Sequence, residues 1–164
     1  MKRILLALVM AVMTVGVNAQ ITLNVRAGAG GSCDSEGFSC FTPCLSLQTN
    51  IPLSAASKFA VSPTLTVATP DMDVVNIILP VYFGYKTILA NQTLFVPKIG
   101  PCVGYLTDNG SFVAGPAAEL AVEIKHFVIG VNGYYSLTST TYDDDKDEYE
   151  FNHYGAFFTL GYKF

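Results

Sequence analysis

A strict alternation of apolar and polar residues is the feature that most constrains this chain. In the segment 59–67, apolar residues at every second position alternate with small or hydroxylated residues. Successive side chains of a β-strand point to opposite faces, whereas a helix repeats every 3.6 residues. The alternation therefore predicts strands rather than helices. Seven further segments show it: 20–28, 38–48, 73–86, 93–106, 112–125, 126–138 and 152–164.

The length of these segments favours strands that cross a membrane. Most of them run for 9 to 14 residues, and a tilted transmembrane strand needs about 9–11 residues. Strands of soluble proteins are shorter, at about 5–6 residues. No stretch after residue 20 has 18 uninterrupted apolar residues, so no transmembrane helix is expected in that part of the chain.

The two faces of the expected strands differ in a way that fits a barrel in lipid. One face carries large aliphatic and aromatic residues, while the other is small and polar with few charges. Only 13% of the residues are charged, against about 25% in soluble domains, which leaves too few to solvate the outside of a soluble barrel. We therefore predict an all-β, eight-stranded antiparallel up-and-down transmembrane β-barrel. Aromatic residues near the segment ends would form its interfacial girdles; the alternative is the aromatic core of a soluble sandwich. These residues are Phe83, Tyr85, Tyr105, Phe112, Phe127, Tyr135, Tyr154 and Tyr162.

Four charged residues on the polar face form a candidate network inside the barrel: Arg26, Lys98, Glu119 and Glu123. An eight-stranded barrel has an interior that side chains can just fill, and a buried charge needs a partner. We expect Arg26 or Lys98 to pair with Glu119.

The first residues have the pattern of a secretory signal peptide. Lys2 and Arg3 precede the apolar run 4–15, and Val17 and Ala19 place small residues before a cleavage site at Gln20. We expect a signal peptide at 1–19 and one barrel domain at 20–164, in a compartment where cysteines can oxidise.

Three motifs resemble one known family. The stretch 79–86 (LPVYFGYK) resembles its "(I/L)P(L/V)xxxYK" strand, 98–105 (KIGPCVGY) resembles its "aGPyvgY" strand, and the end 160–164 (LGYKF) is similar to the closing "GYxF" of outer-membrane barrels. Together they resemble the PorT-like family of outer-membrane β-barrel proteins, over essentially the whole mature chain. This resemblance implies the outer membrane of a Gram-negative cell. Lys98 and Cys102 depart from the family pattern, so details of the interior do not carry over.

The final residues Leu160, Tyr162 and Phe164 look like the signal that the barrel-assembly machinery recognises, and they also suit a last lipid-facing strand. Further expected partners are outer-membrane lipid and lipopolysaccharide. Nucleic acid is not expected, because the net charge is −4 and a phosphate backbone needs cations. The sequence does not indicate an oligomeric state.

An even strand number puts both termini on the periplasmic side. The expected outer loops are then 29–37, 68–72, 108–111 and 139–151, and the periplasmic connections are 49–57, 87–92 and a tight turn near 125–126. The last outer loop is strongly acidic, but it lacks the spacing of a calcium loop. We interpret it as a solvated charge run, and we expect no metal and no cofactor. Its acids are Asp143, Asp144, Asp145, Asp147, Glu148 and Glu150.

Four cysteines, Cys33, Cys40, Cys44 and Cys102, allow three complete pairings. A Cys33–Cys40 bridge would close the first outer loop and is the preferred single bridge. A zinc site is less favoured, because the spacing is irregular.

Some small barrels modify lipid A, and this gives an enzymatic alternative. A dyad of His153 with Ser136 or Ser139 is conceivable, because acyl transfer needs a base beside a hydroxyl. No motif supports it, so no catalytic residue is expected. The sequence predicts a non-catalytic outer-membrane barrel with structural or surface-interaction roles. The main alternative is a secreted soluble barrel that binds a small apolar ligand. A conducting pore is not expected, since open channels appear at about 16 strands.

Overall fold

The computed structural model describes residues 21–34, 37–54, 56–71, 73–90, 92–107, 110–144 and 147–164. Within these ranges the side chains of 34, 37–40, 90, 139–144 and 147–151 are not described. The predicted signal peptide at 1–19 lies outside the described residues and stays a prediction. Among the described residues, no helix has the length and apolar character needed to cross a membrane.

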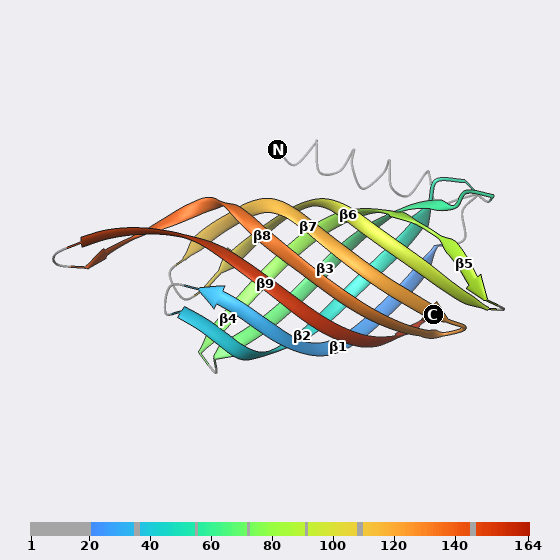
Figure 1. The fold of residues 1–164 in the computed structure, drawn as a ribbon, viewed down its shortest axis with the longest axis horizontal. Helices are drawn as coiled ribbons and strands as arrows, with labels where there is room; N and C mark the ends of the chain where they lie inside the picture. Colours follow the sequence, from blue (N-terminus) through green and yellow to red (C-terminus); the bar gives the residue numbers. More distant parts are fainter. Residues whose placement is uncertain are drawn as a thin grey trace, which may run out of the picture.

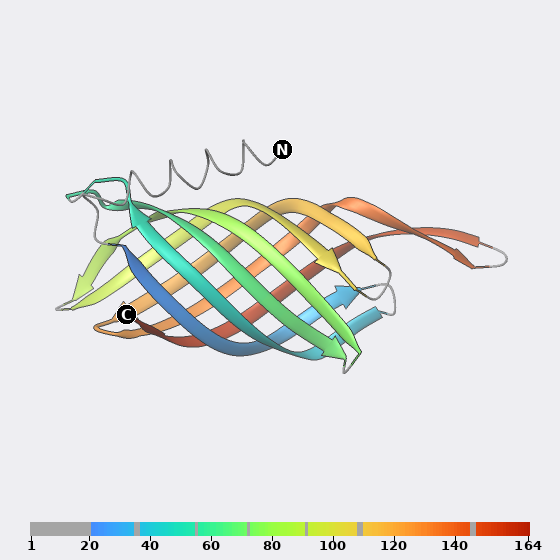
Figure 2. The ribbon, with the colours of Figure 1, turned by 180° about the vertical axis from the view of Figure 1, so that it is seen from behind.

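The described chain is a single antiparallel sheet that closes on itself (Figures 1 and 2). Its strand order is β4-β3-β2-β1-β9-β8-β7-β6-β5, and the pairing of β4 with β6 closes the circle. Lys86 alone separates β4 from β5, and both pair with β6, so together they form one interrupted strand. The prediction of an eight-stranded up-and-down barrel is confirmed. The strands are β1 (Thr22–Asp34), β2 (Gly37–Pro52), β3 (Phe59–Asp71), β4 (Val74–Tyr85), β5 (Thr87–Ala90), β6 (Thr93–Leu106), β7 (Ser111–Ile124), β8 (Phe127–Asp144) and β9 (Asp147–Lys163).

The first and last strands pair along a continuous register from Asn24–Lys163 to Cys33–Tyr154. At this seam the two backbones approach so closely that a Cβ atom at Gly28 would collide with the carbonyl oxygen of Phe158. Glycine is required where another backbone comes this near. The end of β9 stays attached to the sheet, because the amide of Phe164 donates to the carbonyl of Leu23 (2.8 Å).

Several strands are longer than the sequence predicted, and the loops are correspondingly shorter. The expected outer loop 29–37 is wrong, because β1 continues to Asp34 and β2 begins at Gly37. The expected loop 139–151 is wrong for the same reason: β8 and β9 pair as far as Asp144 and Asp147. The expected loop 87–92 contains β5. Polar residues favour turns on average, but backbone ladders can continue through them where the side chains are solvated.

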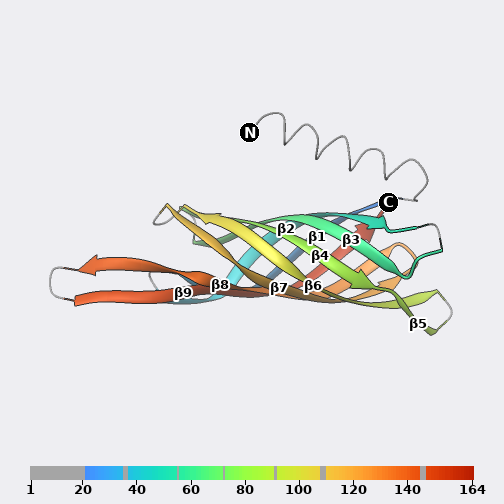
Figure 3. The same cartoon turned by 90° about the horizontal axis from the view of Figure 1, so that it is seen from above.

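The β8–β9 hairpin extends well beyond the barrel wall at the end opposite the C-terminus (Figures 1 and 3). We call this end the hairpin end, and the end with the C-terminus and the turn 125–126 the termini end. Short turns are typical of the periplasmic side of outer-membrane barrels, and long extensions of the outer side.

The wall of the barrel is apolar on the outside and polar on the inside. Along β3, exposed Pro63 and Leu65 alternate with buried Ser62, Thr64 and Thr66. Every strand contributes large hydrophobic residues to the outer surface. Examples from six strands are Leu45, Leu79, Ile99, Leu120, Val131 and Leu160. Such an inverted arrangement is unfavourable in water and suits lipid.

Aromatic rings border this aliphatic surface at both ends. At the termini end, Phe59 packs on Tyr85 with ring centroids 5.0 Å apart, and Tyr162 contacts Phe127 and Phe164. At the hairpin end, Tyr105 packs on Phe112 with centroids 5.1 Å apart. The geometry is that of two interfacial girdles.

Candidate functional site: the barrel interior and its two ends

A cluster of charged side chains fills the interior on the side of the termini end. Glu119 on β7 lies directly opposite Lys98 on β6 in the strand register. Its Oε1 atom accepts from Lys98 Nζ (2.8 Å) and from Arg26 Nη1 on β1 (2.7 Å). Arg26 and Glu119 are each 2% exposed, so these ion pairs are screened little by water or salt. The structure thus brings together three of the four residues of the predicted network.

Gln48 on β2 connects the members of this cluster. Its Oε1 atom accepts from Arg26 Nη2 (2.5 Å) and from Lys98 Nζ (2.6 Å). Its Nε2 atom donates to Glu119 Oε2 (2.9 Å) and to Thr64 Oγ1 (2.9 Å). The Arg26, Gln48, Lys98 and Glu119 side chains, called the charge cluster below, therefore span the interior from β1 and β2 to β6 and β7. Buried charges are tolerated when they are paired and hydrogen-bonded, as Glu119 is through both of its carboxylate oxygens.

The fourth predicted member, Glu123, is not in the charge cluster. Its Oε2 atom accepts from Lys163 Nζ on β9 (2.6 Å), nearer the termini end. The side chain of Lys163 is 20% exposed, whereas that of Glu123 is 2% exposed. This second pair lies at the rim of the interior, where water reaches the ammonium group.

Two glycines make room for the guanidinium group of Arg26. Gly161 lies opposite Arg26 in the β1–β9 register, and a Cβ atom there would collide with the Arg26 Cγ atom. A Cβ atom at Gly130 would lie 3.2 Å from Arg26 Nη1. The chain thus uses small residues on β8 and β9 to seat a large cation from β1.

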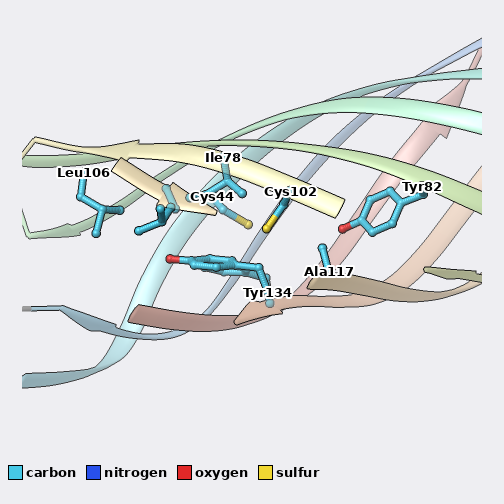
Figure 4. Packing of buried hydrophobic residues seen from close by; sticks show 10 residues of the cluster. Cys44, Ile78, Tyr82, Cys102, Leu106, Ala117 and Tyr134 are labelled. Carbon is cyan, nitrogen blue, oxygen red and sulfur yellow. The ribbon is translucent and has the colours of Figure 1, made fainter. Parts of the chain in front are cut away.

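On the side of the hairpin end, the interior contains a cluster of apolar side chains. Figure 4 shows Ile78, Leu106 and Tyr134 directed into the barrel together with both buried cysteines. We call this group the apolar cluster: Cys44, Ala68, Ile78, Tyr82, Cys102, Leu106, Val113, Ala117, Tyr134 and Phe157. Beside it, a cavity of about 10 Å³ is lined by Thr66, Asn132 and other inward residues, which is space for about one water molecule.

Cys33, Cys44 and Cys102 are free thiols in the structure. The side chain of Cys40 lies outside the described residues, so the Cys33–Cys40 bridge stays a prediction. Among the described residues, no group of three or more His, Cys, Asp and Glu side chains could hold a metal ion.

The residues of the conceivable catalytic dyad face the interior and not the lipid. His153 is fully buried and Ser136 is 1% exposed. The Ser136 hydroxyl donates to the carbonyl oxygen of Thr138 (2.8 Å), and the side chain of Ser139 lies outside the described residues.

The residues of the expected assembly signal line the outer surface of β9. Leu160, Tyr162 and Phe164 are all exposed, and Tyr162 and Phe164 contact each other with centroids 4.9 Å apart. The acidic residues of 143–150 have side chains outside the described set, so their interpretation as a solvated run stays a prediction.

Sequence reasoning missed Gln48 and Lys163 as members of the interior network. Both stand on the polar face of their segments, which is the only available signal. Their partners depend on the register across several strands, and no local pattern specifies that register.

The sequence matches no family profile and no curated relative. Three solved structures share the fold at low identity. Neisserial surface protein A is 9% identical with a TM-score of 0.59, covering 89% of this chain and 97% of that one. The outer membrane protein OprG from Pseudomonas aeruginosa is 14% identical with a TM-score of 0.52, covering 92% and 98%.

The third is Ail, the attachment invasion locus protein of Yersinia pestis, in complex with the heparin analogue sucrose octasulfate. It is 12% identical with a TM-score of 0.51, covering 90% of this chain and 100% of that one. At these identities the comparisons establish the fold alone. The chain folds as an eight-stranded barrel of the kind seen in these bacterial surface proteins.

Proposed function

We propose that the chain is an integral protein of a Gram-negative outer membrane, non-catalytic, with a surface-interaction role at its hairpin end. The observation that carries the proposal is the inverted wall, with an aliphatic outer surface between two aromatic girdles and the ion pairs inside. In lipid every backbone polar group must be hydrogen-bonded within the protein, and a closed barrel meets this requirement. A soluble barrel that binds an apolar ligand would need the opposite arrangement.

The interior supports a structural rather than a conducting role. The charge cluster and the apolar cluster follow each other along the barrel axis, and both are packed. A conducting pore needs a continuous aqueous path, which eight-stranded barrels of this kind do not leave.

The surface-interaction role rests on the hairpin end. All acidic residues of the chain except Glu119 and Glu123 belong to this end in the sequence, at positions 34–36, 71–73, 108 and 143–150. Ail was solved with a polysulfated ligand. The acidic end of this chain would repel such an anion, so we propose that its partners carry positive charge.

Four earlier expectations are part of the same proposal. The exposed row Leu160, Tyr162 and Phe164 on the last strand supports recognition by the barrel-assembly machinery. Export through a signal peptide at 1–19 and membership of the PorT-like family remain proposals that rest on the sequence motifs. The absence of catalysis is supported by the interior position of His153 and Ser136.

The test is expression of the full chain in a Gram-negative host with an epitope tag inserted between Asp144 and Asp147. We expect the protein in the outer-membrane fraction, a gel mobility that changes on heating, and cleavage of the tag by protease added to intact cells. Recovery from the soluble periplasm without detergent would contradict the proposal. Tag protection in intact cells with cleavage only after lysis would contradict the outward orientation of the hairpin end.

A further inference from the structure

The outer surface of the barrel is not uniform, because a groove crosses the seam near the termini end. Its volume is about 580 Å³, within the range of about 300–1,000 Å³ that holds small molecules. Ala27 on β1 lies in its floor, opposite Leu45 on β2 and Leu160 on β9 in the strand register. The larger neighbours rise on both sides of the small alanine, and this difference in side-chain size creates the depression.

The side of the groove formed by β8 and β9 is aromatic toward the termini end. Tyr162 on β9 lies opposite Phe127 on β8, with ring planes at 90°, and the next row places Leu160 opposite Ile129. The lining is almost wholly hydrocarbon, so only an apolar chain can occupy it without losing hydrogen bonds to water.

The groove opens beside a positively charged turn. Lys125 and His126 immediately precede Phe127, and both are exposed. The His126 ring stacks on Tyr162 with centroids 5.5 Å apart and planes at 11°. Its Nδ1 atom lies 3.2 Å from the carbonyl oxygen of Lys163, to which it can only donate. The turn is therefore held against the mouth of the groove by two contacts.

The turns of the termini end, 53–58, 86–92 and 125–126, contain three lysines and no acidic side chain. Lys163 is engaged with Glu123 inside the barrel, whereas Lys125 is exposed. An exposed cation beside a hydrocarbon groove suits a ligand that has an anionic group and an apolar chain.

We propose that this groove is a binding site for a glycerophospholipid with an anionic head group. One acyl chain lies over Ala27 between Leu45 and Leu160, and the phosphate group contacts Lys125 and the exposed edge of His126. The long β8–β9 extension at the opposite end is typical of the outer side, so the lipid comes from the leaflet that faces the periplasm. The inference rests on the proposed membrane location, but it does not depend on any role of the hairpin end.

The experiment is native mass spectrometry of the mature barrel in a neutral detergent, titrated separately with dioleoyl-phosphatidylglycerol and dioleoyl-phosphatidylcholine. The two probes share their chains and differ in head-group charge. For the wild type we expect one tightly retained lipid and about a fivefold preference for phosphatidylglycerol, the effect of one lysine at a membrane surface. Equal retention of the two lipids by the wild type would overturn the proposal.

Two pairs of variants separate the head-group contact from the chain contact. Lys125→Ala should abolish the preference, whereas Lys58→Ala removes an exposed lysine of the same end that does not line the groove and should preserve it. Ala27→Leu should fill the groove and reduce retention of both lipids. Ala118→Leu adds the same side chain on the outer face of β7 and should not.

Loss of the preference in Lys58→Ala to the same extent as in Lys125→Ala would overturn the proposed site. The preference would then come from the combined positive charge of this end. Retention by Ala27→Leu equal to that of Ala118→Leu would overturn the groove. Heat-modifiable migration is measured for every variant. A soluble wild type that never shows it refutes the membrane location, whereas a folded barrel without lipid preference refutes this inference alone.

Discussion

The two halves of the barrel interior differ in the main cluster of side chains that each contains. On the side of the termini end, the charge cluster joins Arg26, Lys98 and Glu119 through Gln48. On the side of the hairpin end, the apolar cluster packs residues such as Ile78, Leu106 and Phe157. Apolar contacts can be trimmed one at a time at a graded cost, whereas removing one charge leaves its partners buried and uncompensated.

The hydrophobic residues of the outer surface are exposed, so they contribute little to a conventional core. The interior therefore fixes how the strands across the barrel meet. The charge cluster does so with directional bonds from four strands, and we expect it to be the more sensitive half.

The largest effect is expected for Glu119→Gln. The substitution preserves the shape of the side chain but leaves Arg26 and Lys98 without a buried counter-charge, at a cost of about 3–5 kcal/mol of unfolding free energy. Urea unfolding of the folded barrel in lipid vesicles measures it. A stability equal to that of the wild type would show that the charge cluster does not hold the two sides of the barrel together.

The second largest effect is a recovery of unfolding free energy relative to Glu119→Gln. In Arg26→Met/Lys98→Met/Glu119→Gln, all three charges are replaced together by residues of similar volume. We expect this variant to be about 2 kcal/mol more stable than Glu119→Gln alone, because whole buried ion networks can be replaced at little net cost. Losses that instead add up across the three sites would mean that each residue acts independently.

The sequence predicted the wall of the barrel better than its ends. The alternation in 59–67 and 112–125 arises because successive side chains face the outer surface and the interior in turn. This holds along the full length of the strands in the barrel wall. Near the hairpin end, the residues of 139–144 carry no apolar–polar alternation, although their backbones pair with β9. Residues 29–31 carry none either, because they are Ala29, Gly30 and Gly31, yet all three pair with β9.

The interior was predictable only in its composition. Charged residues on the polar face had to pair, and Lys98 and Glu119 are direct cross-strand neighbours. The assignment of Glu123 to Lys163, and of Gln48 to the charge cluster, depends on how β1, β2, β7 and β9 are staggered around the barrel. This stagger is a property of the closed sheet, and the sequence pattern of a single strand does not determine it.

A third, smaller effect tests the apolar cluster. Ile78→Val removes one buried methyl group, and we expect a loss of about 1 kcal/mol. Ile99→Val is the matched control, because Ile99 is 65% exposed on the outer surface and lipid can fill the space that the methyl group leaves. The control should change the unfolding free energy by less than about 0.5 kcal/mol. Equal losses at the two positions would show that the interior and the lipid-facing surface contribute alike.

The smallest effect is expected at the rim, for Glu123→Gln. Lys163 loses its ion-pair partner, but its side chain is already 20% exposed, and the ammonium group can turn toward water. We therefore expect a loss of about 0.5 kcal/mol, in the range of partly solvated pairs, and a loss that shrinks further as salt is added, since exposed charges are screened. Glu119→Gln should keep its full effect in the same salt series, because Arg26 and Lys98 cannot reach water. A loss at Glu123 as large and as insensitive to salt as that at Glu119 would place both pairs in one buried network and remove the distinction between interior and rim.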